Sequence, residues 1–347
     1  MKARLVIICI FLLIASGTVL LNSCHKTPLS YYRPTPINFI TPSGFPIPVY
    51  NFQNNPITEE SFLLGRKLFY DGRLSLDGHF PCSSCHQQVA AFTTYEHDRS
   101  HGYNNSHTLR NAPGLANLAW YPVYKWDGSA SNLEDISLAH ITAPNEMAES
   151  MNGIIAKLKY DTAYQRMFQA AYGAPEVTQV GILKALSQFV INLVSSNSKY
   201  DKVKRGEASF STQEQNGYTI FQNKCNSCHT EPLFTDFSFR NVGFEIEPFL
   251  KDFGRMRVTG DPKDSLKFRV PSLRNVDFTS YYLHDGRLSA MRMMLEHYRN
   301  GITSSPTLDP LLSNGITLTD TEENDIIAFL RTLSDSSFIN NPRYREP

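Results

Sequence analysis

Hydrophobic residues recur at helical spacing in several stretches of the chain, and the alternating pattern of a β-strand is nearly absent. The clearest stretches are 56–69, 180–190 and 326–333. Apolar residues three and four positions apart give a helix one hydrophobic face, which can then pack against another helix. The pattern predicts an all-α fold.

Helix starts and helix-free segments can also be recognised. Ser211 with Glu214, and Thr319 with Glu322, have the spacing of capping boxes, which begin helices. Residues 24–55, in contrast, contain prolines that block a regular helix, so we expect a tether followed by a packed extended arm.

The N-terminus has the layout of an export signal, with two basic residues before an apolar run from Leu5 to Leu21. We expect residues 1–23 to be removed and the protein to work in the periplasm or cell envelope. The segment ending at Cys24 resembles a lipobox, in which the cysteine is lipidated and tethers the chain to a membrane. An uncleaved membrane anchor is the alternative, although the run is short for a bilayer span.

An internal similarity organises the rest of the chain. The matching segments are Gly65–Phe69 with Gly217–Phe221, Pro113–Asn117 with Pro271–Asn275, and Trp126–Gly128 with His284–Gly286. The last two pairs share one offset of 158 residues. This predicts an internal duplication, with an N-terminal domain over 56–203 and a C-terminal domain over 204–347.

Length and charge limit the function only broadly. The 347 residues suffice for two domains, and 33 basic residues balance 33 acidic ones. No polybasic surface for nucleic acid or acidic lipid is indicated, so we expect no nucleic-acid partner and no membrane contact beyond the lipid anchor.

The cysteines point to covalently attached haem. Of six cysteines, Cys9 lies in the export signal, Cys24 in the lipobox, and four in two Cys-x-x-Cys-His motifs. The four are Cys82, Cys85, Cys225 and Cys228. A Cys-x-x-Cys can also be a redox dithiol or half a zinc site. The histidine that follows each motif, His86 or His229, favours two c-type haems with that histidine on the iron.

Further segments follow the two haem motifs in a specific order. They are Arg110–Pro113, Trp126–Gly128, Glu146–Met147, Arg269–Asn275 and Tyr282–Gly286. Over residues 56–335 the chain resembles the bacterial di-haem cytochrome c peroxidase and MauG family. The resemblance implies two cytochrome c-like haem domains, an N-terminal one where peroxide is reduced and a C-terminal one that transfers electrons.

The resemblance also implies roles for individual residues. His86 is the proximal ligand of the active haem, and His229 is that of the electron-transfer haem. Trp126 matches the tryptophan between the haems, and Glu146 matches the carboxylate that moves protons during O–O cleavage. The alternatives are a buried structural aromatic for Trp126 and a surface charge for Glu146.

The chain departs from the classical peroxidases near the active haem. Tyr103 stands where they carry a blocking histidine, and Ile136 replaces a glutamine. We expect an open site that needs no reductive activation, although three histidines flank Tyr103: His97, His101 and His107. His140, six residues before Glu146, replaces a distal proline and is expected to face this haem as an acid–base partner or as an iron ligand. A solvated helix histidine is the alternative.

Tyr298 falls at the sixth-ligand position of the second haem, where MauG-type members carry tyrosine. A phenolate ligand there lowers the reduction potential. Rival ligands lie close by: Met291, Met293, Met294 and His297. His284, Arg269 and Arg274 are expected to bind haem propionates.

The family also binds calcium between its domains. The matching positions are Asn111, Thr279 and Tyr281, which would offer an amide oxygen and two backbone carbonyls. We therefore expect one Ca²⁺ beside the two haems.

The leading hypothesis is a peroxidase that reduces hydrogen peroxide to water with electrons from a small donor protein, a cytochrome c or a cupredoxin. One alternative is MauG-like oxidation of tyrosine or tryptophan in a partner protein. Another is a non-enzymatic di-haem electron carrier. The resemblance also implies that a homodimer can form, as family members often do.

Overall fold

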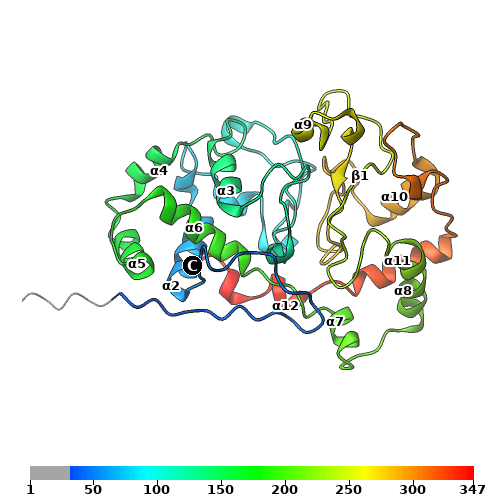
Figure 1. Ribbon diagram of the computed structural model, residues 1–347, viewed down its shortest axis with the longest axis horizontal. Helices are drawn as coiled ribbons and strands as arrows, with labels where there is room; N and C mark the ends of the chain where they lie inside the picture. The colour runs from blue at the N-terminus through cyan, green and yellow to red at the C-terminus, as the bar shows by residue number, and fades with distance from the viewer. Residues whose placement is uncertain (1–31) are drawn as a thin grey trace, which may run out of the picture. The chain divides into compact units, whose positions relative to one another are not determined.

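The computed structural model describes residues 32–347, of which Pro34–Pro347 form one compact unit. The expected export signal and the lipobox with Cys24 lie outside the described residues. The α-helices (Figure 1) are α2 Glu59–Phe69, α3 Leu133–Thr142, α4 Met151–Leu158, α5 Thr162–Tyr172, α6 Gln179–Ile191, α7 Lys199–Lys204, α8 Thr212–Lys224, α9 Met256–Thr259, α10 Met291–Glu296, α11 Asp320–Arg331 and α12 Ser336–Ile339. A π-helix, His297–Gly301, continues α10.

Strand structure is minor. Within residues 32–347 one sheet is present, in which β1, Phe239–Arg240, pairs antiparallel with β2, Phe268–Arg269. The predicted helical fold is therefore confirmed as helix-rich with little sheet. Within the same residues, every helix is too short or too polar to cross a bilayer.

Two helix pairs form the centres of the two halves. α2 packs against α6, and α8 packs against α11. A glycine allows each close approach: a Cβ on Gly65 would lie 1.9 Å from the Ala185 carbonyl oxygen, and a Cβ on Gly217 would lie 1.8 Å from that of Asp325. Any side chain at either glycine would force its helix pair apart.

Each half has its own hydrophobic core, but the cores exchange segments. The first core surrounds α2 and α6, and it includes Phe338 and Tyr344 from the C-terminal end of the chain. Figure 1 shows α12 beneath α6. The second core surrounds α8 and α11, and it includes Tyr200 of α7. Packing therefore crosses the expected boundary at 203/204, which stays a prediction.

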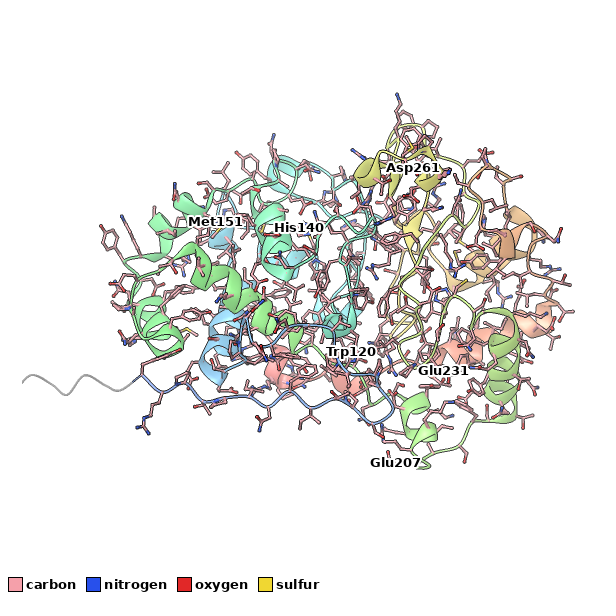
Figure 2. The ribbon with its side chains drawn as sticks, viewed as in Figure 1. Trp120, His140, Met151, Glu207, Glu231 and Asp261 are labelled. Carbon is pink, nitrogen blue, oxygen red and sulfur yellow. The ribbon has the colours of Figure 1, made fainter. Side chains whose placement is uncertain are left out.

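The segment before α2 is extended and packs on a third cluster, centred on Trp120 (Figure 2). Trp120 Nε1 donates to the Pro46 carbonyl at 2.7 Å. The backbone N–H groups of Val49 and Tyr50 both donate to the Ala119 carbonyl at 3.0 Å. This segment is held mainly by its aromatic side chains and by these backbone hydrogen bonds.

The backbone turns in the same way at positions 158 residues apart. Asn117 and Asn275 have φ of 62° and 64°, and Gly128 and Gly286 have φ of 71° and 72°. The isolated bridge between Tyr124 and Ala130 likewise recurs between Tyr282 and Leu288. The loops after the two motifs therefore share a local geometry.

Candidate functional site

Two cavities lie over the two Cys-x-x-Cys-His motifs. The first, about 550 Å³, is lined by Cys82, Cys85 and His86 among others. The second, about 310 Å³, is lined by Cys225, Cys228 and His229 among others. The surface that lines both cavities is mainly apolar, as a haem requires.

Both motif histidines are held in the same tautomer. His86 Nδ1 lies 2.9 Å from the Phe92 carbonyl oxygen, and His229 Nδ1 lies 3.1 Å from that of Phe234. A carbonyl can only accept, so Nδ1 donates and Nε2 keeps a lone pair for a metal. Burial lowers the pKa of His86 to about 4 and also lowers the pKa of His229, so both rings are neutral.

The motif cysteines are half-buried free thiols. Burial raises the pKa of Cys82 and of Cys225 to about 12, which disfavours the thiolate that a redox dithiol or a zinc ligand needs. Within the part of the chain that the structure describes, no cluster of three or more His, Cys, Asp or Glu is arranged to hold a metal ion. These cysteines therefore suit covalent attachment better than metal binding.

A narrow wall separates the cavities. The residues that line both are Asn111, Ala112, Pro113, Gly114, Trp126 and Arg269. Trp126 is 9% exposed, and its Nε1 donates to the Asn111 carbonyl at 2.9 Å. The indole is thus fixed in orientation between the two cavities.

Arg269, in the same wall, has a buried side-chain N–H donor without a hydrogen-bond partner. Only 4% of the residue is exposed, its Nε donates to the Lys125 carbonyl at 3.2 Å, and its buried Nη1 has no partner. Leaving a charged donor unpaired in the interior is costly. An anionic group in these cavities would remove that cost, and haem propionates have the required charge, so the lining fits haem.

Arg274 differs from Arg269 because it already has a carboxylate. Its Nη1 and Nη2 donate to the two Asp201 oxygens at 3.0 and 2.8 Å, and its Nε donates to the Pro232 carbonyl. Arg274 lines the second cavity, but its guanidinium is mainly engaged in this ion pair. A propionate contact for Arg274 stays a prediction.

The first cavity contains a bonded polar pair. His140, on the last turn of α3, bonds Glu146 Oε2 through Nδ1, and both side chains line the cavity with His86. The imidazole is 40% exposed and the carboxylate 26%. Figure 2 labels His140 on α3. The pair therefore connects the cavity with solvent.

The loop before Arg110 brings one histidine to this cavity. His101 lines it, whereas His97 and His107 pack against the His101 ring with centroids 4.8 and 4.4 Å away. Tyr103 does not line the cavity, and its backbone N–H donates to the Glu146 carbonyl at 2.7 Å. Ile136, which was predicted to replace a glutamine, lines the first cavity.

Tyr298 lines the second cavity from the π-helix His297–Gly301. Such widened turns frequently occur at functional sites. Burial, together with the nearby Cys225 and Cys228, raises the pKa of the Tyr298 hydroxyl. The free protein therefore holds a neutral phenol there, and a bound metal ion would be needed to favour the phenolate.

The structure separates the rival ligands of this cavity. Met291 and Met294 line it, but Met293 does not and is 39% exposed. His297 also lies outside the lining, because its Nε2 bonds the Val242 carbonyl at 2.8 Å. His284 lines the cavity and stacks on Phe268.

The three expected calcium ligands lie on one cavity. Asn111, Thr279 and Tyr281 all line the second cavity. Asn111 Nδ2 donates to the Asp98 carbonyl at 2.8 Å, which leaves its amide oxygen available as an acceptor.

One element that lines the first cavity was not anticipated from the sequence. Arg257 and Val258, both in α9 of the second half, line it. A signal was present: 27 residues separate His86 from Pro113, but 42 separate His229 from Pro271. The additional residues of the second half include α9.

Comparison with known proteins agrees with this geometry. Residues 59–209 match the family described as di-haem cytochrome c peroxidase. The methylamine utilization protein MauG of Methylorubrum extorquens is 32% identical over 301 residues, 85% of this chain and 83% of that protein. Cytochrome c551 peroxidase of Nitrosomonas europaea is 32% identical over 279 residues, 78% of this chain and 79% of that protein. The solved structure of a MauG-like protein associated with microbial copper homeostasis is 33% identical with a TM-score of 0.79, over 90% of this chain and 99% of that one.

Proposed function

This chain belongs to the di-haem cytochrome c peroxidase family, and on that premise we propose that it reduces hydrogen peroxide to water with electrons from a small donor protein. The family implies two c-type haems. Cys82, Cys85 and His86 would hold the first, and Cys225, Cys228 and His229 the second. Bound haem supplies an iron that can accept peroxide and exchange electrons.

The observation that carries the proposal is the bonded His140–Glu146 pair on the cavity of His86. Peroxide reduction needs a proton removed from one oxygen and returned to the leaving oxygen. Glu146 can do both from one position. His140 bonds one carboxylate oxygen of Glu146 and is partly exposed to solvent. It can therefore pass protons to Glu146 and leave the other carboxylate oxygen free to act in the cavity.

The wall between the cavities suits electron transfer. Trp126 lines both cavities, and its indole is fixed by the Asn111 carbonyl. Tyr298 is the proposed sixth ligand of the second haem, because it lines that cavity on a widened helical turn, and Met291 and Met294 are its remaining rivals. Arg269, with its unpaired Nη1, is proposed to bind a propionate.

A second candidate function is oxidation of tyrosine or tryptophan in a partner protein. The tyrosine on the second cavity favours it, since a phenolate ligand would stabilise the oxidised haem. An electron carrier would need no acid–base pair on either cavity, so the His140–Glu146 pair argues against that reading.

Steady-state turnover of hydrogen peroxide with a reduced small cytochrome distinguishes these functions. The peroxidase proposal expects sustained, saturable consumption of both substrates. Negligible turnover with a clear spectral response to peroxide would favour oxidation of a partner protein. Neither turnover nor spectral response would leave only the carrier.

We also propose that the two halves are copies of one unit. The glycine contacts of α2 and α8, the common offset of 158 residues and the matching histidine–carbonyl bonds support it. A calcium ion held by Asn111, Thr279 and Tyr281 and a lipid on Cys24 are further proposals. Metal analysis before and after a chelator tests the first, and mass spectrometry of the mature N-terminus tests the second.

A further inference from the structure

The Phe92 carbonyl accepts the His86 Nδ1–H bond, and the Phe92 side chain is completely buried. Ala91 and Phe92 have φ of 54° and 62°. Non-glycine residues rarely adopt this left-handed conformation unless their surroundings hold them in it. The position of the carbonyl therefore depends on what packs around the Phe92 ring.

Two of the rings around Phe92 come from the far end of the chain. Phe338 and Tyr344 pack edge-on against it, with centroids 5.6 and 6.3 Å away. Gln88 Nε2, in the same loop as Phe92, donates to the Asn341 carbonyl at 2.9 Å. Residues 336–344, the C-terminal segment, therefore contact the loop that carries the acceptor of His86.

The C-terminal segment is itself anchored on the first half. The Tyr344 hydroxyl donates to the Asn192 carbonyl at 2.9 Å, and the Tyr70 hydroxyl donates to the Tyr344 carbonyl at 2.7 Å. Arg66 Nη1 also donates to the Arg343 carbonyl at 3.1 Å. These bonds make the segment a fixed support for Phe92 rather than a loose tail.

The second half has the reciprocal arrangement. Phe234, whose carbonyl accepts from His229, packs against Phe221 and Phe329 of its own half and against Tyr200 at 4.8 Å. Tyr200 follows α6, the last long helix of the first half, just as Phe338 follows α11. Each histidine acceptor is thus supported by a segment that leaves the other half.

We propose that the C-terminal segment is a positioning element for the haem on His86. Its packing holds the Phe92 carbonyl at hydrogen-bonding distance from His86 Nδ1. This hydrogen bond orients the imidazole and raises its basicity as an iron ligand. The inference rests on haem attachment at His86 and not on the substrate of the enzyme. A protein that does not reduce peroxide could therefore still confirm this inference, and the reverse also holds.

The test is Phe338→Ala in the full-length holoprotein, with the reduction potentials of both haems and their iron–histidine stretching frequencies as readouts. A weaker Nδ1–H bond makes the imidazole a poorer donor. We expect the potential of the His86 haem to rise and its stretching frequency to fall, while the His229 haem is unchanged. Phe338→Leu, which keeps most of the apolar volume, should restore both values.

Tyr200→Ala is the matched variant, and it should shift only the His229 haem. Equal shifts of both haems in Phe338→Ala would overturn the proposal, because they would reflect general loosening. A folded Phe338→Ala protein with neither haem shifted would also overturn it. If that variant does not fold, Gln88→Ala removes one hydrogen bond of the segment: a selective shift of the His86 haem supports the proposal, and no shift refutes it.

Discussion

The two cavities support their motif histidines in the same way and differ in the other side chains that line them. In each, Nδ1 donates to a phenylalanine carbonyl, at 2.9 Å for His86 and 3.1 Å for His229. The first cavity adds the His140–Glu146 pair, and the second adds Tyr298. The same support of the motif histidine therefore occurs beside two different sets of cavity side chains.

The offset of 158 residues identifies the positions of the second half that correspond to His140 and Glu146. His140 corresponds to Tyr298, and Glu146 corresponds to Ser304, which is exposed and does not line the second cavity. The half that is proposed to bind peroxide thus carries a proton-transfer pair. The half that is proposed to relay electrons has the half-buried phenol of Tyr298 instead of that pair.

The largest effect is expected from the carboxylate that only the first cavity has. Glu146→Gln keeps the shape but cannot accept a proton, so peroxide turnover should fall by about 100- to 10,000-fold. Ser304→Ala, at the corresponding position of the second half, should leave turnover unchanged. Steady-state kinetics measures both, and an unimpaired Glu146→Gln enzyme would refute the assignment.

Next in size are the two glycines at the helix crossings. Gly65→Ala and Gly217→Ala each place a Cβ against a backbone oxygen, and each should cost about 3 kcal/mol of stability through overpacking. Chemical denaturation, followed at each haem, would measure the losses. A large cost in one half and none in the other would contradict equivalent packing of the halves.

Smaller effects are expected from substituting His140 and Tyr298, the residues that differ at corresponding positions of the two cavities. His140→Ala should reduce turnover about tenfold, because it removes the group that orients Glu146 and passes protons to it. Tyr298→Phe should change the electron paramagnetic resonance signal of the His229 haem and leave that of the His86 haem alone. No spectral change in Tyr298→Phe would leave Met291 or Met294 as the ligand.

The smallest effects are expected at the helix caps. The Thr58 hydroxyl accepts from the Ser61 N–H at the start of α2, and Ser211 forms a capping box with Glu214 at the start of α8. Thr58→Ala and Ser211→Ala should each cost about 1 kcal/mol. Thermal unfolding would reveal whether the reciprocal box makes the second cap the stronger one.

The attachment motifs and a set of residues that line the cavities could be predicted from the sequence. The reason is that Cys-x-x-Cys-His is a local pattern, and that the resemblance to the di-haem cytochrome c peroxidase family identified Trp126, His140 and Glu146. The expected side chains do line the cavities. Their roles stay predictions, as does the distribution of the propionate partners between Arg269 and Arg274.

Other features depend on contacts between residues far apart in the chain. The longer interval between His229 and Pro271 indicates extra residues in the second half, but not that Arg257 reaches the first cavity. Likewise, no local pattern indicates that Asp201 pairs with the guanidinium of Arg274. The bond between His140 and Glu146, although only six residues separate them, was also not anticipated, because it forms across the end of α3.

The sequence by itself predicted the two haem-attachment motifs and the helical fold, because both depend on residues within a few positions of one another. Only the tertiary structure decided which segment supports which histidine. Phe338 lies 246 residues after Phe92 yet packs against it, and Tyr200 packs against Phe234 of the other half. Such exchanges follow from burying apolar rings wherever the folded chain brings them together, and that free energy depends on the area buried rather than on sequence distance.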